Sequence, residues 1–175
     1  MSNVLIGIIG VILFIGLALA GASFLGEKFM SSENSTTATK TISDMQQISA
    51  AINMRRLKTG NDLIASNYAT NLQSLTPRFL KSVPTVPMSN ATYQTVDRNG
   101  GRNNLPVHHI KANLGDNTDG EVTSVCREIE AQRGSQDVDA AMATIPASQY
   151  ADRINASVYG CLRHQNGKTY AFLRI

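Results

Sequence analysis

The sequence contains no tryptophan, and only five tyrosines and five phenylalanines occur among its 175 residues. A core with so few large rings has to be filled mainly by aliphatic and small side chains. Charge of one sign does not cluster either, because the 16 Lys and Arg residues are scattered, without a basic run or interleaved aromatic residues. This distribution argues against a nucleic-acid platform. We therefore predict no direct nucleic-acid binding and ascribe the net charge of +3 to surface solvation.

Patterns that support catalysis are also missing. The sequence has no Gly-rich phosphate loop, no nucleophile elbow and no Cys/His dyad, so we predict neither an enzyme nor a cofactor. His108 and His109 are adjacent, so a strand would point them to opposite faces, and we expect surface histidines rather than metal ligands. The acids of the stretch LGDNTDGEV suggest a calcium loop, but they lack its spacing, and we expect a solvated turn.

Cysteine is nearly absent as well, since Cys126 and Cys161 are the only two in the chain. Neither lies in a C-x-x-C pair or beside a metal-ligand pattern. If this part of the chain is exported, the two should form a disulfide. The alternative is a pair of unrelated buried thiols, which requires a reducing compartment.

What the sequence does have is one long apolar run, Val4 to Leu25, with no charged residue before Glu27. As a helix, these 22 residues would span about 33 Å, close to the thickness of the hydrocarbon core of a bilayer. The pattern Ala18-Leu19-Ala20 suggests signal-peptide cleavage. However, no basic residue precedes the run, and the run is longer than the apolar region of a usual signal peptide. We therefore expect a retained helix.

Glycines interrupt this run at a cost of up to about 1 kcal/mol each in an exposed helix interior. A simple membrane anchor gives no reason for them. Gly16 and Ala20 form a small-xxx-small pair, which allows two helix backbones to approach closely in an apolar medium. The segment is therefore suited to contact other copies of itself.

An amphipathic helix is predicted to follow without a break, because no proline occurs before Arg56. Apolar residues recur at three- and four-residue spacing on the face expected to pack on the rest of the chain: Ile42, Met45, Ile48 and Ile52. Gly60 is a typical residue to end such a helix, and basic residues precede it in the last turn.

Beyond Gly60 we predict a small antiparallel sheet, which makes the fold class α+β with a long N-terminal α-helix packed on that sheet. Three prolines mark a loop, with a short helical turn over 74–81. Asn166-Gly167 is expected to form a hairpin turn. The remaining predicted elements are strands over 91–96, 107–112, 157–162 and 169–175 and a helix over 120–133 that ends at Gly134.

This arrangement resembles the type IV pilins over the whole chain, and the type IVb class most, which includes the thin pili of conjugative plasmids. The stretch LQSLTPRFLKSVPTVP is similar to the pilin segment after the long helix, and the region between Cys126 and Cys161 is similar to the C-terminal disulfide region of the family. The resemblance implies a filament-core helix over 1–29, its amphipathic continuation over 30–60, and a head over 61–175 with a Cys126–Cys161 disulfide.

The resemblance further implies a structural subunit that forms a helical homopolymer with identical subunits. Its helix would be held in the bacterial inner membrane before assembly, and the finished pilus would be extracellular and serve attachment, cell contact or mating. Partners would be the inner-membrane assembly machinery and the prepilin peptidase. The residues expected to pack in the filament core are Leu5, Gly7, Gly10, Phe14, Gly16, Ala20 and Gly21.

Two departures from the family pattern concern the N-terminus. The basic leader of a prepilin does not precede Met1, so we expect the chain to be the mature form, with Met1 as its N-methylated residue. Leu5 stands where the family usually has a glutamate that neutralises the terminal amine of a neighbour. This favours a minor pilin or a pseudopilin of a secretion system as one alternative. The other alternative is a monomeric single-pass membrane protein with a periplasmic ligand-binding head.

Overall fold

The computed structural model describes residues 2–60, 72–98 and 107–175. Within these ranges the side chains of residues 2–6, 22–27, 97–98 and 107 are not described. The chain has two compact units, Met1–Asn34 and Ser35–Ile175, and the second is called the head below.

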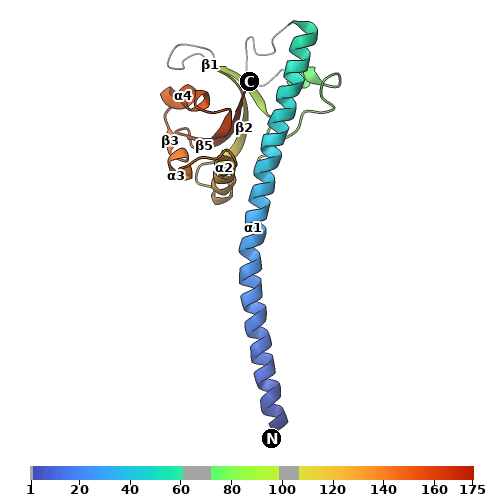
Figure 1. The fold of residues 1–175 in the computed structure, drawn as a ribbon, viewed down its shortest axis with the longest axis vertical. Helices are drawn as coiled ribbons and strands as arrows, with labels where there is room; N and C mark the ends of the chain where they lie inside the picture. The colour runs from blue at the N-terminus through green and yellow to red at the C-terminus, as the bar shows by residue number, and fades with distance from the viewer. Residues whose placement is uncertain (1, 61–71, 99–106) are drawn as a thin grey trace. The chain divides into compact units, whose positions relative to one another are not determined.

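The helix α1, Ser2–Thr59, contributes residues to both units (Figure 1). Its continuity agrees with the prediction, since no proline interrupts the i to i−4 hydrogen bonds. It ends at Gly60, whose φ of 66° lies in the left-handed region that glycine adopts easily. The Gly60 N–H donates to the Arg56 carbonyl at 2.9 Å, and Arg56 and Lys58 stand in the last turn, where cations oppose the helix dipole.

The head contains a five-stranded sheet with the strand order β1-β2-β5-β4-β3. The strands are β1 (Gln94–Arg98), β2 (Val107–Asp116), β3 (Thr144–Ile145), β4 (Tyr159–His164) and β5 (Lys168–Arg174). The neighbouring pairs are antiparallel except β3 and β4, which are parallel. The four predicted strands pair antiparallel as expected. β3 was not predicted, and it adds a parallel pair because a helical crossover returns the chain to β4 in the direction of β3.

The predicted strands appear with shifted ends. β1 begins three residues later than expected and β2 runs four residues further, to Asp116. The longer β2 is irregular between Asn113 and Gly115. Gly115 has a φ of 143°, and a Cβ there would lie 2.8 Å from Cγ2 of Val122, so this position excludes larger residues. The β4–β5 hairpin turns at Gly167, where φ is 82°.

The described part of the head has further helical segments besides α1. The 3₁₀ turn η1 (Leu72–Leu75) overlaps the start of the predicted turn over 74–81. α2 (Gly120–Gln132) begins where predicted, with the Asp119 side chain as its N-cap, and Gly134 follows it with a φ of 80°. Three short segments were not predicted, because they are too short to show helical periodicity: α3 (Val138–Ala141), η2 (Ala147–Gln149) and α4 (Tyr150–Asn155).

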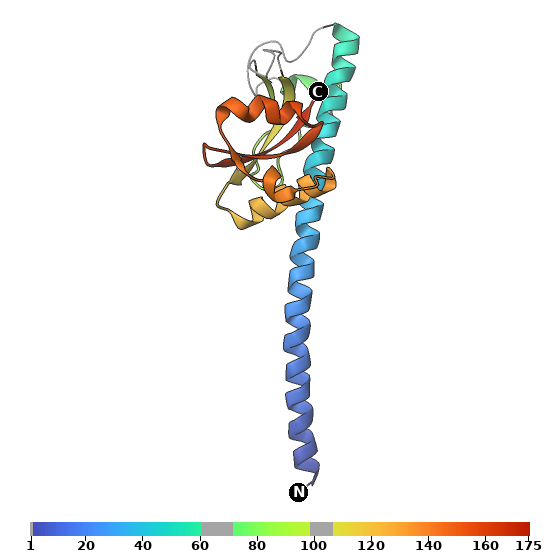
Figure 2. The same cartoon turned by 60° about the vertical axis from the view of Figure 1, so that its left-hand side comes forward.

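Both faces of the sheet are covered. On one face, α1 and α2 pack on alternate residues of the central strands, such as Ile110, Ala112 and Leu173. On the other face, α4 packs on Leu162 and Phe172 (Figures 1 and 2). The core is built mostly from aliphatic and small residues, as the poverty in aromatic residues predicts.

Candidate assembly site

The first unit presents apolar side chains on every side of the helix. Consecutive residues of an α-helix are offset by about 100°, so a run of apolar positions covers its whole circumference. Nine of these side chains are 49–74% exposed: Ile8, Ile9, Val11, Ile12, Leu13, Phe14, Ile15, Leu17 and Leu19. A helix of a soluble domain normally has one apolar stripe and a polar opposite face. Over residues 7–21 the helix has no such polar face.

Four glycines of this helix have no close neighbour among the described residues. A Cβ added at Gly7, Gly10, Gly16 or Gly21 would meet nothing within 4 Å. At 3.6 residues per turn, Gly7, Gly10 and Gly21 lie on the side that also carries Phe14, whereas Gly16 lies on the opposite side with Ala20. The exposed Phe14 ring is thus flanked by positions where a neighbouring helix could approach closely.

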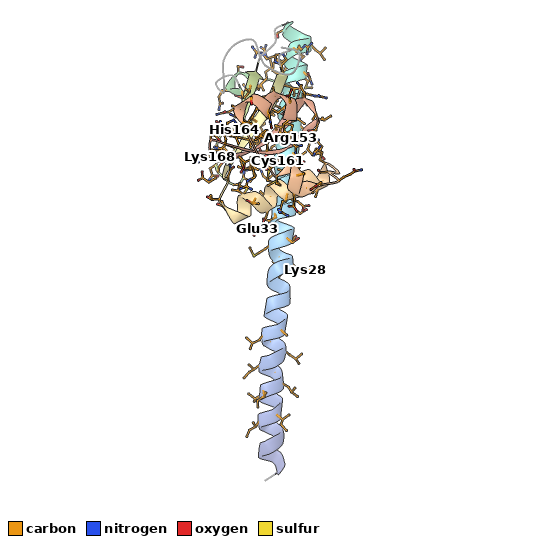
Figure 3. The ribbon with its side chains drawn as sticks, turned by 90° about the vertical axis from the view of Figure 1, so that its left-hand side faces the viewer. Lys28, Glu33, Arg153, Cys161, His164 and Lys168 are labelled. Atoms are coloured by element: carbon orange, nitrogen blue, oxygen red, sulfur yellow. A yellow bond between two sulfur atoms is a disulfide. The ribbon has the colours of Figure 1, made fainter. Side chains whose placement is uncertain are left out.

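Two of the predicted residues, Met1 and Leu5, lie at or near the N-terminus. Met1 lies outside the described residues, and Leu5 belongs to α1 but its side chain is not described. Among described side chains, the first charged one is Lys28, followed by Glu33 (Figure 3). No helix in the part of the chain that the structure describes is both long and apolar enough to cross a membrane.

Within the head, α1 is held to the sheet by an apolar face that includes two buried polar residues, Thr41 and Asp44. Ile42, Met45, Ile48 and Ile52 all lie in the main hydrophobic core. Beside them, Asp44 accepts hydrogen bonds from Lys40 Nζ at 3.0 Å and from the buried hydroxyl of Tyr93 at 3.3 Å. Burial and the neighbouring Asp44 carboxylate raise the pKa of Tyr93 far above its usual value.

The two cysteines form the disulfide that an exported domain was expected to have. Cys126 of α2 and Cys161 of β4 are both fully buried, with their Cα atoms 5.5 Å apart. The bond joins a helix to the final hairpin across 35 positions of sequence, and the enclosed segment includes α3, β3 and α4. It therefore fixes the region of the head that has the shortest secondary-structure elements.

A buried carboxylate, which the sequence analysis missed, supports this disulfide. Glu130 is fully buried, and its Oε1 accepts the Cys161 N–H at 2.6 Å. Its Oε2 pairs with Arg133 and, at 3.2 Å, with Arg153 of α4 (Figure 3 labels Arg153 and Cys161). The sequence does contain a signal for the burial of Glu130. This residue follows Cys126 by four positions and so continues the buried face of α2.

The close fit around Glu130 also explains why residue 160 is a glycine. A Cβ at Gly160 would lie 2.6 Å from Glu130 Oε1 and 3.1 Å from the Phe172 ring. Any larger residue at this position would push the carboxylate away from the Cys161 amide.

Surface positions were predicted for the histidines, but one of them is buried. His109 is fully buried beneath α4, with its Nε2 3.4 Å from the Tyr150 hydroxyl. A series of ring contacts continues from Tyr150 to His164 and on to Tyr170, with centroid separations of 5.7 and 6.4 Å. The prediction is wrong for His109 because α4, which covers it, was not recognised in the sequence.

Two acidic side chains of the turn before α2, Asp116 and Asp119, form contacts within the head. Asp119 caps α2 by accepting the amides of Glu121 and Val122, and Asp116 Oδ1 pairs with Lys168 Nζ at 2.6 Å. This hydrogen bond raises the pKa of Lys168. Among the described residues, no group of His, Cys, Asp and Glu is arranged to hold a metal ion.

Comparison with known proteins identifies no relative, because no protein family, curated protein or solved structure matches the chain.

Proposed function

We propose that this protein is a structural subunit of a type IV pilus-like filament, which polymerises through its N-terminal helix. One observation carries the proposal: over residues 7–21 the helix is apolar on every side and carries four glycines that have no described neighbour within 4 Å of an added Cβ. Close packing against copies of the same helix accounts for both features. Small residues let the backbones approach, and the surrounding side chains remove one another from water or lipid.

The cohesion available from such packing is large. Each 1,000 Å² of apolar surface removed from water is worth about 25 kcal/mol before the entropic costs of association. A filament held in this way persists after its subunits leave the bilayer. The head, with its modest core and one disulfide, forms the exterior.

The same proposal includes the steps by which the chain reaches the filament. Before assembly, the apolar run holds the subunit in the bacterial inner membrane, with the head on the oxidising side where the disulfide forms. A prepilin peptidase produces the mature terminus and methylates Met1, and the inner-membrane assembly machinery adds the subunit to the filament. The extracellular pilus then serves attachment, cell contact or conjugative mating.

Shearing the surface of cells that express the full chain tests this proposal. We expect the sheared fraction to contain fibres with the chain as their major component. Replacing Gly16 by Leu should abolish these fibres while the protein still accumulates in the membrane. Leu17→Met is the matched control, because it changes the next position while conserving apolar character and volume.

The opposite results support other functions. A monomeric membrane protein with a ligand-binding head would stay in the membrane fraction and tolerate Gly16→Leu. A pseudopilin would copurify with a secretion complex at low copy number and would not form long fibres.

A further inference from the structure

One end of the head is basic, and none of its cations is paired with an acidic side chain that the structure describes. The last turns of α1 contribute Arg55, Arg56 and Lys58, and the segment that packs against them contributes Arg78 and Lys81. Contacts place the two segments together, because Arg55 Nη1 donates to Ser74 Oγ at 3.2 Å and Lys58 Nζ lies 5.9 Å from the centre of the Phe79 ring. No Asp or Glu occurs over 45–60 or 72–96. We call these five cations the basic end.

The helices α2 and α3 give the head an acidic surface. Four carboxylates there have no cationic partner within the described part of the chain: Asp119, Glu121, Glu128 and Asp137. Asp119, Glu121 and Asp137 are exposed and Glu128 is half-buried. The cations of this region are already paired, Arg127 with Asp139 and Arg133 with Glu130. We call the four carboxylates the acidic end.

The two ends lie on opposite sides of the head. In Figures 1 and 2 the last turn of α1 is at one extreme of the head and α2 with α3 is at the other. None of the five cations of the basic end forms an ion pair within the described residues. The charges of the two ends therefore cannot satisfy each other within one subunit.

We propose that the basic end of one head docks on the acidic end of the next copy of this chain. This inference rests on the proposed function, since it describes how heads meet in the filament. A contact between two different surfaces of identical subunits is head-to-tail, and it repeats without closing when the rotation does not form a ring. Complementary charge sets the register of such a contact and suppresses wrong arrangements.

The charge pattern favours a second copy over a polyanion such as nucleic acid. A polyanion would use the basic end alone and would leave the acidic end without a role. Among the described residues of this end, the Phe79 ring is the aromatic group that lies with these cations, and a nucleic-acid platform usually interleaves several. A second copy uses both ends with nearly equal and opposite charge.

Reciprocal charge reversal in the full chain tests the contact. One variant carries Arg78→Glu and Lys81→Glu, a second carries Glu121→Lys and Glu128→Lys, and a third carries all four changes. Fibres per cell are counted by electron microscopy. We expect each double variant to form about tenfold fewer fibres, because like charges then face each other, and the fourfold variant to recover to within about twofold of the unmodified chain. An intact disulfide and an unchanged unfolding temperature in detergent show that each variant folds.

A second measurement locates the contact directly. A zero-length carbodiimide joins lysines to carboxylates that lie in contact, and fibres assembled from isotopically light and heavy subunits distinguish links between subunits from links within one. We expect mixed-isotope links from Lys58 or Lys81 to Glu121, Glu128 or Asp137.

The inference is overturned if unmodified fibres form and both double variants assemble normally, or if no such links appear. It is also overturned if the Arg78/Lys81 variant loses binding to DNA while its fibres are unchanged, since a polyanion is then the partner. If the unmodified chain forms no fibres, it is the proposed function that fails, and this inference falls with it.

Discussion

The Tyr93 hydroxyl donates a hydrogen bond to the Asp44 carboxylate at 3.3 Å, and so joins the segment before β1 to the middle of α1. The two residues are 49 positions apart in the sequence. Their contact lies beside buried apolar side chains of α1 such as Met45 and Ile48. Because a buried polar pair has few alternative partners, this contact fixes the register of the helix against the sheet more strictly than aliphatic packing does.

Removing this hydroxyl should alter stability in a manner that depends on pH. Tyr93→Phe is expected to lower the free energy of unfolding by about 1–2 kcal/mol at neutral pH. The raised pKa of Tyr93 means that the folded state keeps its proton above pH 10, where the unfolded chain releases it. The stability of the unmodified chain should then fall by up to about 1.4 kcal/mol per pH unit from this group alone. Denaturant unfolding at pH 8, 10 and 11 checks this.

The difference between the unmodified chain and Tyr93→Phe isolates this residue from the other groups that titrate at high pH. The difference should shrink as pH rises above 10. A difference that stays constant from pH 8 to 11 would show that Tyr93 is not held neutral by the fold.

Loss of the disulfide should destabilise the head substantially. Replacing Cys126 and Cys161 together by Ala is expected to cost about 3–4 kcal/mol, because the unfolded chain loses a constraint on a loop of 35 positions. Denaturant unfolding of the oxidised and double-Ala proteins measures the difference. The reduced unmodified chain is the control and should resemble the double variant. Two free thiols in protein isolated from the cell envelope would contradict the disulfide.

Neutralising Glu130 should cost more than neutralising its neighbour on the same helix. Glu130→Gln is expected to destabilise the head by about 3 kcal/mol, since it leaves Arg133 and Arg153 without their buried partner. Glu128→Gln is the matched control, with an expected change below about 0.5 kcal/mol at a half-buried position without an ion pair. Equal effects of the two substitutions on the unfolding midpoint would mean that Glu130 carries no special role.

Much of the fold could be predicted from sequence because its signals are local. The ends of α1 and α2 follow from Gly60 and Gly134, and the last hairpin follows from Asn166-Gly167. The crossover through α4 could not be predicted, because six residues give too few turns to show periodicity. Missing α4 also led to the wrong assignment of His109 to the surface.

The candidate assembly site likewise has features that the sequence predicts and contacts that it does not. The apolar run and its glycines are visible in the sequence, whereas the contacts of Glu130 and Tyr93 depend on residues far apart along the chain. The basic end was missed for a related reason. Its cations belong to two separate segments, 55–58 and 78–81, which come together because the segment after η1 packs on the last turns of α1.

Electron cryomicroscopy of fibres sheared from cells that express the unmodified chain tests the central claim most directly. The account predicts a helical assembly in which residues 7–21 of neighbouring copies pack together along the fibre axis, with the closest backbone approaches at Gly7, Gly10, Gly16 or Gly21 and with Phe14 buried between subunits. A fibre core built from the heads instead, or a chain found only as a membrane-bound monomer with no fibre, would contradict it.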